Sequence, residues 1–146
     1  MADYQLAARV IAQFEGYISV AAWDVNAYRL GYGSDTEGPE QRPVRRGMTT
    51  TPARALANLA ARIPQYEAKI VAQVGAGPWG SLSANAKASL LSVAYNYGLL
   101  PAGLASVVRR GSPPAAIAIA IQALAGDNRG INAHRRTAEA ALARKA

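Results

Sequence analysis

Residues 51–74 read TPARALANLAARIPQYEAKIVAQV. Threonine followed by proline is a strong helix start, because the threonine side chain caps free backbone N–H groups and proline fits the first helical turn. Apolar residues then recur at helical spacing from Leu56 to Val74, so the stretch predicts a long helix that Pro64 kinks or splits. The chain differs in texture on the two sides of this helix.

Before this helix, the sequence predicts a short helix and a small β region. Asp3 can cap a first helix whose apolar residues repeat every three or four positions and which should end near Gly16. Glycines, prolines and aromatic or β-branched residues fill positions 17–47, as is typical of short strands joined by tight turns.

After this helix, the alanine-rich sequence favours further helices. We expect a turn over residues 75–80, and helices over residues 83–97, 99–110, 112–124 and 133–144. The predicted fold class is therefore α+β and predominantly α, with an N-terminal helix, a small antiparallel β region and a helical C-terminal lobe. We expect a single domain, 1–146, with a β-containing lobe at about 15–50 and a helical lobe at about 51–146 plus the first helix.

The composition limits the chemistry. The chain has no cysteine and one histidine, His134, which excludes a disulfide framework, a thiolate metal site and a multi-histidine metal centre. We expect no cofactor and no metal. The net charge of +7, of which residues 99–146 supply +5 through seven bases and two acids, favours a polyanionic partner. Such a partner is a nucleic acid, an anionic membrane or the acidic envelope of bacteria.

Glu15 is the most informative candidate for catalysis. It ends the first predicted helix, where unsatisfied carbonyl groups disfavour the ionised carboxylate, and a protonated carboxyl is what a general acid needs. Asp24 follows nine residues later, and a hairpin would let it return to the mouth of that helix; two carboxylates in different environments suit glycoside hydrolysis. From position alone, Glu15 is equally a solvated helix end and Asp24 a turn residue.

Four short motifs carry a family resemblance. Glu15-Gly16, the nine-residue step to Asp24, and Gly31-Tyr32-Gly33 resemble the phage-type lysozymes, glycoside hydrolase family 24. Three further stretches resemble that family's central-helix lead, its signature helix and its closing Arg-Arg-x-x-Glu element: residues 47–55, 88–98 and 130–139. The matches stand in the family's order and cover roughly residues 5–144, which implies a lysozyme-like fold.

The resemblance implies a role for each matching position. Glu15 would donate a proton to the β-1,4 bond between N-acetylmuramic acid and N-acetylglucosamine. Asp24 would stabilise the oxocarbenium-like transition state or orient the attacking water. Tyr32, Ser34 and Asn96 would bind the sugar.

The closing element implies a basic partner for the acid. Arg135 is expected near Glu15, by analogy with a C-terminal arginine that contacts the family's catalytic glutamate. The alternative for Arg135 and Arg136 is a solvated basic face.

One position departs from the family. Arg29 stands where members usually carry a threonine that holds the nucleophilic water, and we include it in the catalytic site. The hydroxyl function either passes to Ser34 or Thr36 or is absent, and Arg29 can instead pair with Asp24. Asp35 is a weaker candidate for a second acid, for which a turn role is favoured.

Three functions remain open from the sequence. The resemblance favours a muramidase that hydrolyses bacterial peptidoglycan and lyses cells. A lytic transglycosylase would cut the same bond without water and leave 1,6-anhydro products. A non-catalytic basic protein would bind wall or nucleic acid, but no nucleic-acid motif is recognisable, so we expect no nucleic-acid partner.

Location and further partners follow from charge and from the N-terminal residues. Polar side chains recur every few positions there, so no signal peptide is evident. We expect a monomer that accumulates in the host cytoplasm and reaches the wall after holin-type release. The basic C-terminal region, Arg135 to Lys145, is expected to contact anionic outer-membrane or wall polymers.

Overall fold

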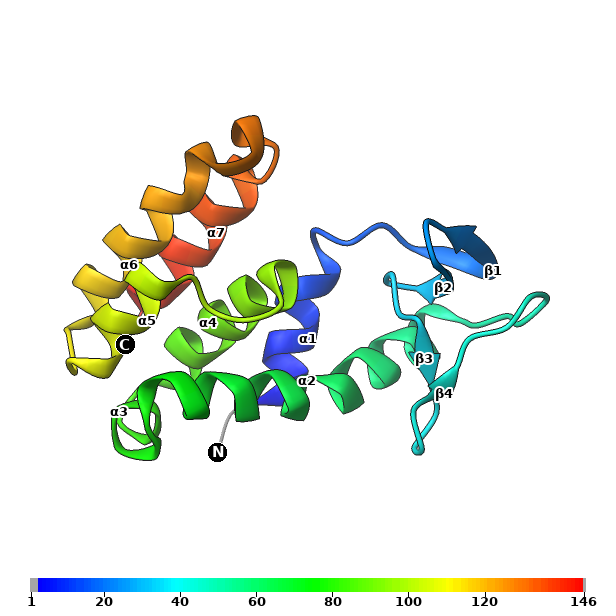
Figure 1. The fold of residues 1–146 in the computed structure, drawn as a ribbon, viewed down its shortest axis with the longest axis horizontal. Coiled ribbons are helices and arrows are strands. Elements are labelled where there is room, and N and C mark those ends of the chain that lie inside the picture. The colour runs from blue at the N-terminus through cyan, green and yellow to red at the C-terminus, as the bar shows by residue number, and fades with distance from the viewer. Residues whose placement is uncertain (1–2, 146) are drawn as a thin grey trace.

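A computed structural model describes residues 3–145 as a helical lobe and a small β lobe joined by one long helix (Figure 1). The elements in chain order are α1 (Tyr4–Ala12), β1 (Ile18–Asp24), β2 (Ala27–Gly31), β3 (Thr36–Glu37), β4 (Arg42–Pro43), α2 (Pro52–Val74), α3 (Ala76–Gly80), α4 (Ala84–Tyr97), α5 (Ala102–Arg109), α6 (Pro114–Gln122), the 3₁₀ segment η1 (Ala123–Gly130) and α7 (Ala133–Ala143). The predicted fold class is confirmed.

The helix starts follow the capping residues. The Asp3 side chain accepts the Leu6 N–H at the start of α1, and the Thr51 hydroxyl accepts the Arg54 N–H at the start of α2. Helix α2 continues through Pro64, so this proline does not split it.

Two predicted boundaries are wrong. Helix α1 ends at Ala12 and not near Gly16, so the catalytic candidate Glu15 lies in the turn that follows the helix. Its backbone N–H still donates to the Ile11 carbonyl, at 3.1 Å. The expected turn over 75–80 contains the short helix α3, whose Trp79 is buried.

The core lies in the helical lobe, around α4. Residues 86–94 of this helix are all buried, which is expected for a helix that is covered on every side. Helix α4 packs against α1, α2 and α7. The core thus fixes α7, at the end of the chain, against the first helix.

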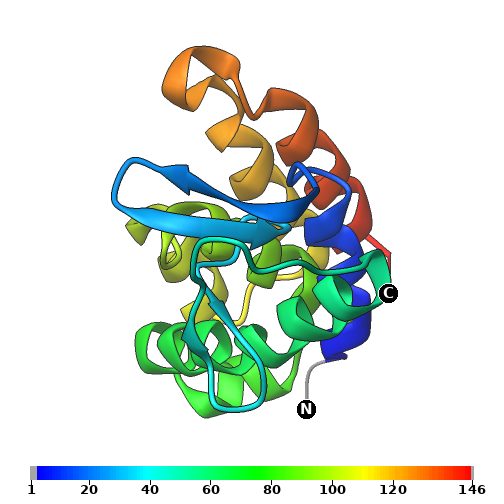
Figure 2. The same cartoon turned by 90° about the vertical axis from the view of Figure 1, so that its right-hand side faces the viewer.

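The β lobe consists of two antiparallel hairpins, β1–β2 and β3–β4. Viewed from the β side, the β1–β2 hairpin crosses in front of the helices, and its tip points away from α1 (Figure 2). Gly31 ends β2 with φ of +63°, and a Cβ there would lie 2.8 Å from the Ala55 Cβ of α2. Only glycine therefore fits where the hairpin meets the long helix.

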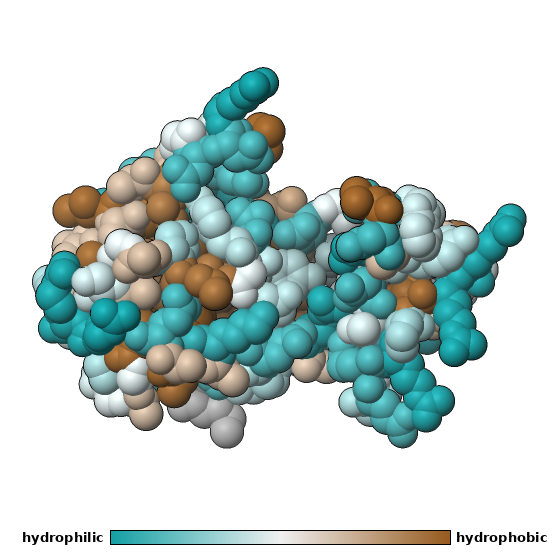
Figure 3. Space-filling view, in the orientation of Figure 1, coloured by the Kyte–Doolittle hydropathy of each residue, from teal (hydrophilic) through white to brown (hydrophobic). Residues whose placement is uncertain are grey.

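The surface is hollowed between the two lobes. In the space-filling view it dips between the upper ends of α6 and α7 and the β1–β2 hairpin, and the C-terminal end of α1 lies below this dip (Figures 1 and 3). No helix within residues 3–145 is long and apolar enough to cross a membrane.

Candidate active site

Glu15 lies where the two lobes meet. Its Oε1 is 2.9 Å from Nη1 of Arg135, which α7 supplies from the helical lobe. Its Oε2 would lie 3.9 Å from a Cβ placed on Gly33, which belongs to the turn after β2. The side chain is 26% exposed. The carboxyl is therefore held from one side and open to solvent, as a proton donor must be.

Arg135 is fixed by a buried network. Its Nε donates to Glu139 at 3.0 Å, and its Nη2 donates to the Ser92 carbonyl oxygen, also at 3.0 Å. The Arg135 side chain is 4% exposed, and its guanidinium lies 5.6 Å from the Phe14 ring centroid. The predicted contact between Arg135 and Glu15 is confirmed, and the alternative of a solvated basic face is wrong.

Arg136 and Glu139 extend this network into the core. Both are fully buried, with Arg136 Nε 2.8 Å from Glu139 Oε2. Burial raises the pKa of Glu139, while the Ser92 hydroxyl and both arginines oppose that rise. Arg136 Nη2 also donates to Asn96 Oδ1 at 3.1 Å, so Asn96 lies at the exposed edge of the network.

Glu139 was missed as a site residue by the sequence reasoning. The spacing Arg-Arg-x-x-Glu could have revealed it, because residues three and four apart share one face of a helix. The same burial corrects a second prediction. Of the four bases in residues 135–145, Arg144 and Lys145 are exposed, whereas Arg135 and Arg136 are internal. The expected basic membrane-contacting face is therefore wrong.

Asp24 does not come to the mouth of the first helix. It pairs with Ala27 beside the hairpin turn, whereas Ile18 pairs with Gly31 at the opposite end. At the usual rise of a strand, the four steps between these two pairs span about 13 Å. The Asp24 side chain is exposed, and its backbone oxygen accepts an N–H two residues on at 2.6 Å. The turn role is therefore observed, and the predicted return of Asp24 to Glu15 is wrong.

Arg29 pairs with Asp35 and not with Asp24. Its Nη1 lies 3.6 Å from Asp35 Oδ2, and Nη1 of Arg62, from α2, donates to Asp35 Oδ1 at 2.9 Å. Partial burial alone would raise the pKa of Asp35, but the hydrogen bond and charge of Arg62, together with the charge of Arg29, hold it below the ordinary value.

The residues proposed to bind sugar beside the glycine pattern face different surroundings. Ser34 is 3% exposed, and its backbone pairs both ways with Leu30 in a tight turn. Its hydroxyl is thus closed off from a substrate, contrary to its predicted role. Tyr32 is half-buried, and its ring packs 5.4 Å from that of Tyr17.

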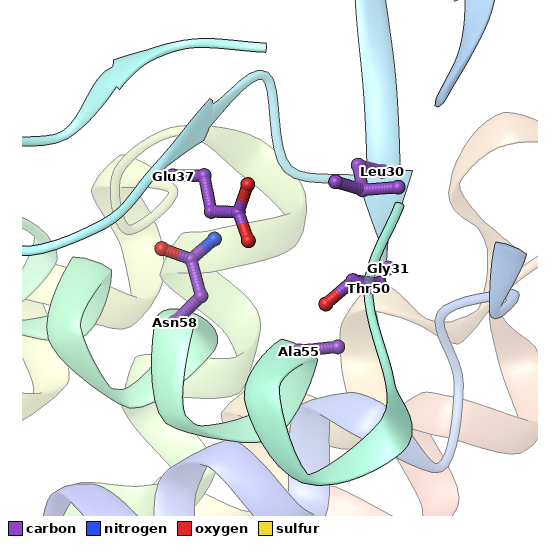
Figure 4. A pocket seen from close by; sticks show the side chains of 6 residues that line it. All are labelled: Leu30, Gly31, Glu37, Thr50, Ala55 and Asn58. Atoms are coloured by element: carbon purple, nitrogen blue, oxygen red, sulfur yellow. The ribbon is translucent and has the colours of Figure 1, made fainter. Parts of the chain in front are cut away.

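Two cavities lie elsewhere in the β lobe, away from Glu15. One is a narrow gap between β2, β3 and the start of α2, where the side chains of Glu37, Asn58 and Thr50 point toward one another (Figure 4). The other is an open groove on the outer side of β3 and α2. Glu37 is paired with Arg54 at 3.3 Å, so the gap is a packing feature of the lobe.

Within the described residues, no three His, Asp or Glu side chains form a group that could hold a metal ion. The chemistry of the site therefore rests on Glu15, its arginine and the polar residues of the β lobe. A two-lobed, mostly helical fold with a half-exposed acid at the lobe junction defines a lysozyme-like hydrolase.

Comparisons with known proteins agree. The chain matches the phage lysozyme family over residues 12–139 and belongs to that family, whose members are peptidoglycan hydrolases. Its fold is similar to that of a mutant of P22 lysozyme, with a TM-score of 0.78 at 24% identity over 97% of both chains. The endolysin of Escherichia coli O157:H7 phage FAHEc1 gives a TM-score of 0.71 at 23% identity, over 94% of this chain and 90% of that one.

A third similar structure is the muramidase domain of SpmX from Asticaccaulis excentricus. It gives a TM-score of 0.70 at 21% identity, over 93% of this chain and 92% of that one. A comparison with curated protein sequences gives no match.

Proposed function

We propose that the protein is a muramidase that hydrolyses the β-1,4 bond between N-acetylmuramic acid and N-acetylglucosamine. The observation that carries the proposal is the Glu15 carboxyl, open to solvent at the lobe junction and held by Arg135 at 2.9 Å. Glu15 gives its proton to the glycosidic oxygen as the bond from that oxygen to C1 breaks. Water then adds to C1 and leaves a reducing end.

Arg135 positions Glu15 without being committed to it alone. The guanidinium also pairs with Glu139, which is fully buried 3.0 Å away. The positive charge is therefore already compensated by an internal carboxylate. This arrangement leaves Glu15 oriented by a hydrogen bond and free to exchange its proton with a substrate.

The direct test is digestion of purified peptidoglycan by the wild type and by Glu15→Gln, with mass spectrometry of the products. We expect reducing muramic acid ends from the wild type and a loss of at least about 100-fold in the variant, because a glutamine cannot donate the proton. Glu40→Gln, which removes an exposed carboxylate of the β lobe, is the matched control. Equal rates for Glu15→Gln and the control would contradict the proposal.

A lytic transglycosylase is the second candidate. The position of the family threonine carries Arg29, and the neighbouring Ser34 hydroxyl is buried. A site without a hydroxyl to hold water favours internal attack by the substrate, which forms a 1,6-anhydro end. The same mass spectra distinguish the two reactions, because the anhydro product is lighter than the hydrolytic product by one water.

We propose further that the protein lyses host cells as a monomer, after it passes from the cytoplasm through a holin-type pore. Its place in the phage lysozyme family supports this role. In cells that express the protein with and without a pore-forming partner, we expect lysis only in the presence of the pore. Lysis that is independent of the pore would contradict the proposed route, and a dimer in size-exclusion chromatography would contradict the monomer.

A further inference from the structure

Both hydroxyl groups that could replace the family threonine are occupied. Ser34 is buried, as described above. The Thr36 hydroxyl donates to Gln41 Oε1 at 2.7 Å and accepts from Arg62 Nη1 at 2.8 Å. Neither group is free to hold a water molecule against a sugar. Asp35, the residue between them, has a side chain that is 40% exposed.

The Asp35 carboxylate is built into the β lobe from two directions. Arg29 approaches it from β2 and Arg62 from α2. Arg29 occupies the position at which the family carries its water-holding threonine, so the departure from the family and the contact with Asp35 are one feature. The two guanidinium groups keep the carboxylate ionised, which a group that accepts a proton from water requires.

Asp35 also shares its surroundings with Glu15. It follows Gly33, which contacts the Glu15 carboxyl, by two residues. Behind the two acids lies Tyr95 of α4, whose pKa is raised by burial and by the charge of Glu15 and is opposed by the charge of Arg62. The charges of Glu15 and of the arginine that holds Asp35 therefore act on one side chain.

We propose that Asp35, and not Asp24, is the second carboxylate of the reaction and activates the water that attacks C1. This inference rests on the proposed muramidase function. As the water oxygen bonds to C1, one water proton passes to the Asp35 carboxylate. The bond from C1 to the glycosidic oxygen breaks, and that oxygen receives the proton of Glu15. Exchange with solvent then returns both acids to their starting states.

The experiment compares Asp35→Ala, Asp24→Ala and Glu15→Gln on purified peptidoglycan, with and without sodium azide. Azide can attack C1 without losing a proton, so it replaces both the water and its base. We expect Asp35→Ala to lose about 100-fold or more in kcat. Azide should restore turnover of this variant and yield a glycosyl azide, which mass spectrometry detects. Glu15→Gln should stay inactive with azide, because its leaving group still lacks a proton.

Two further variants guard against a folding effect. Asp35→Asn keeps the size of the side chain, and its thermal midpoint shows whether the arginine contacts still support the fold. Glu37→Gln removes a carboxylate from a second arginine pair of the same lobe, with Arg54 at 3.3 Å, and should keep its activity.

The outcomes separate the two proposals. Azide rescue of Asp35→Ala supports the inference. A loss without rescue assigns Asp35 a purely structural role and overturns it, as does azide rescue of Asp24→Ala. Nearly full activity of Asp35→Ala beside an inactive Glu15→Gln overturns the inference and leaves the proposed function standing. If the wild type releases no reducing ends, the proposed function itself fails.

Discussion

Arg135 Nη1 lies 2.9 Å from Glu15 Oε1, although 120 residues separate them in the chain. The contact joins α7 to the turn that follows α1. It also joins the exposed acid to a buried set of partners, since the same guanidinium donates to Glu139 and Ser92. The position of the catalytic candidate therefore depends on the packing of the last helix.

Arg135→Lys should lower both activity and stability. A single ammonium group cannot reach Glu15, Glu139 and the Ser92 carbonyl with the planar, forked geometry of a guanidinium. We expect at least a tenfold loss in kcat on peptidoglycan, about 1.4 kcal/mol in transition-state stabilisation, and a lower urea midpoint. The control is Arg144→Lys, an exposed position just after α7. Wild-type rates in Arg135→Lys would show that a positive charge alone is sufficient.

Gly31→Ala should destabilise the β lobe. The residue has φ of +63°, and the new Cβ would lie 2.8 Å from the Ala55 Cβ, closer than carbon atoms pack. Backbone strain and overpacking together should cost about 1 to 3 kcal/mol in the free energy of unfolding. Gly16→Ala, whose Cβ would meet nothing within 4 Å, should change it by less than about 0.5 kcal/mol. Equal urea midpoints for the two variants would contradict this account.

Tyr4 should make the fold sensitive to alkali. Its hydroxyl donates to Glu67 Oε1 at 2.6 Å, and this hydrogen bond, with burial and the Glu67 charge, raises the pKa of Tyr4 to about 12. Because the folded pKa lies above that of an unfolded tyrosine, the bond contributes its full stability below about pH 10 and loses it as the pH rises toward 12.

The urea midpoint should therefore fall over this alkaline range in the wild type. Tyr4→Phe should be less stable at neutral pH and should show a shallower alkaline fall. Identical slopes in the two proteins would show that Tyr4 does not titrate differently in the folded state.

Local signals in the sequence were sufficient for most of the fold. The caps at Asp3 and Thr51 are side-chain to backbone contacts over three residues, and such contacts can be read from adjacent positions. Helix α3 was missed because a tertiary contact stabilises it: Trp79 is buried and its indole N–H donates to Glu67 at 2.9 Å.

The site was only partly accessible from the sequence. The contact between Arg135 and Glu15 followed from a family resemblance, since no local pattern links residues so far apart. The placement of Asp24 failed because the number of residues between two acids does not determine how far a hairpin extends before it turns. Asp35 was set aside as a turn residue because its partner Arg62 lies 27 residues away on α2.

Arg29→Gln should move the acid limb of the pH–activity profile to higher pH. The charges that face Asp35 are Arg29 from β2 and Arg62 from α2, with Tyr95 behind Arg62 and Glu15 beyond it. The two arginines hold the pKa of Asp35 below its ordinary value, so the carboxylate that accepts the water proton stays ionised in acid. Removal of one charge raises this pKa, and activity then fails at a less acidic pH.

The measurement is kcat/KM on peptidoglycan across the acid range, which reports the free enzyme. Arg54→Gln removes an equal charge from the same lobe beside Glu37 and should leave the acid limb in place. An unmoved limb in Arg29→Gln, or equal shifts in both variants, would mean that the limb does not report Asp35. A shift confined to Arg29→Gln would tie the departure from the family threonine to the acid that replaces its function.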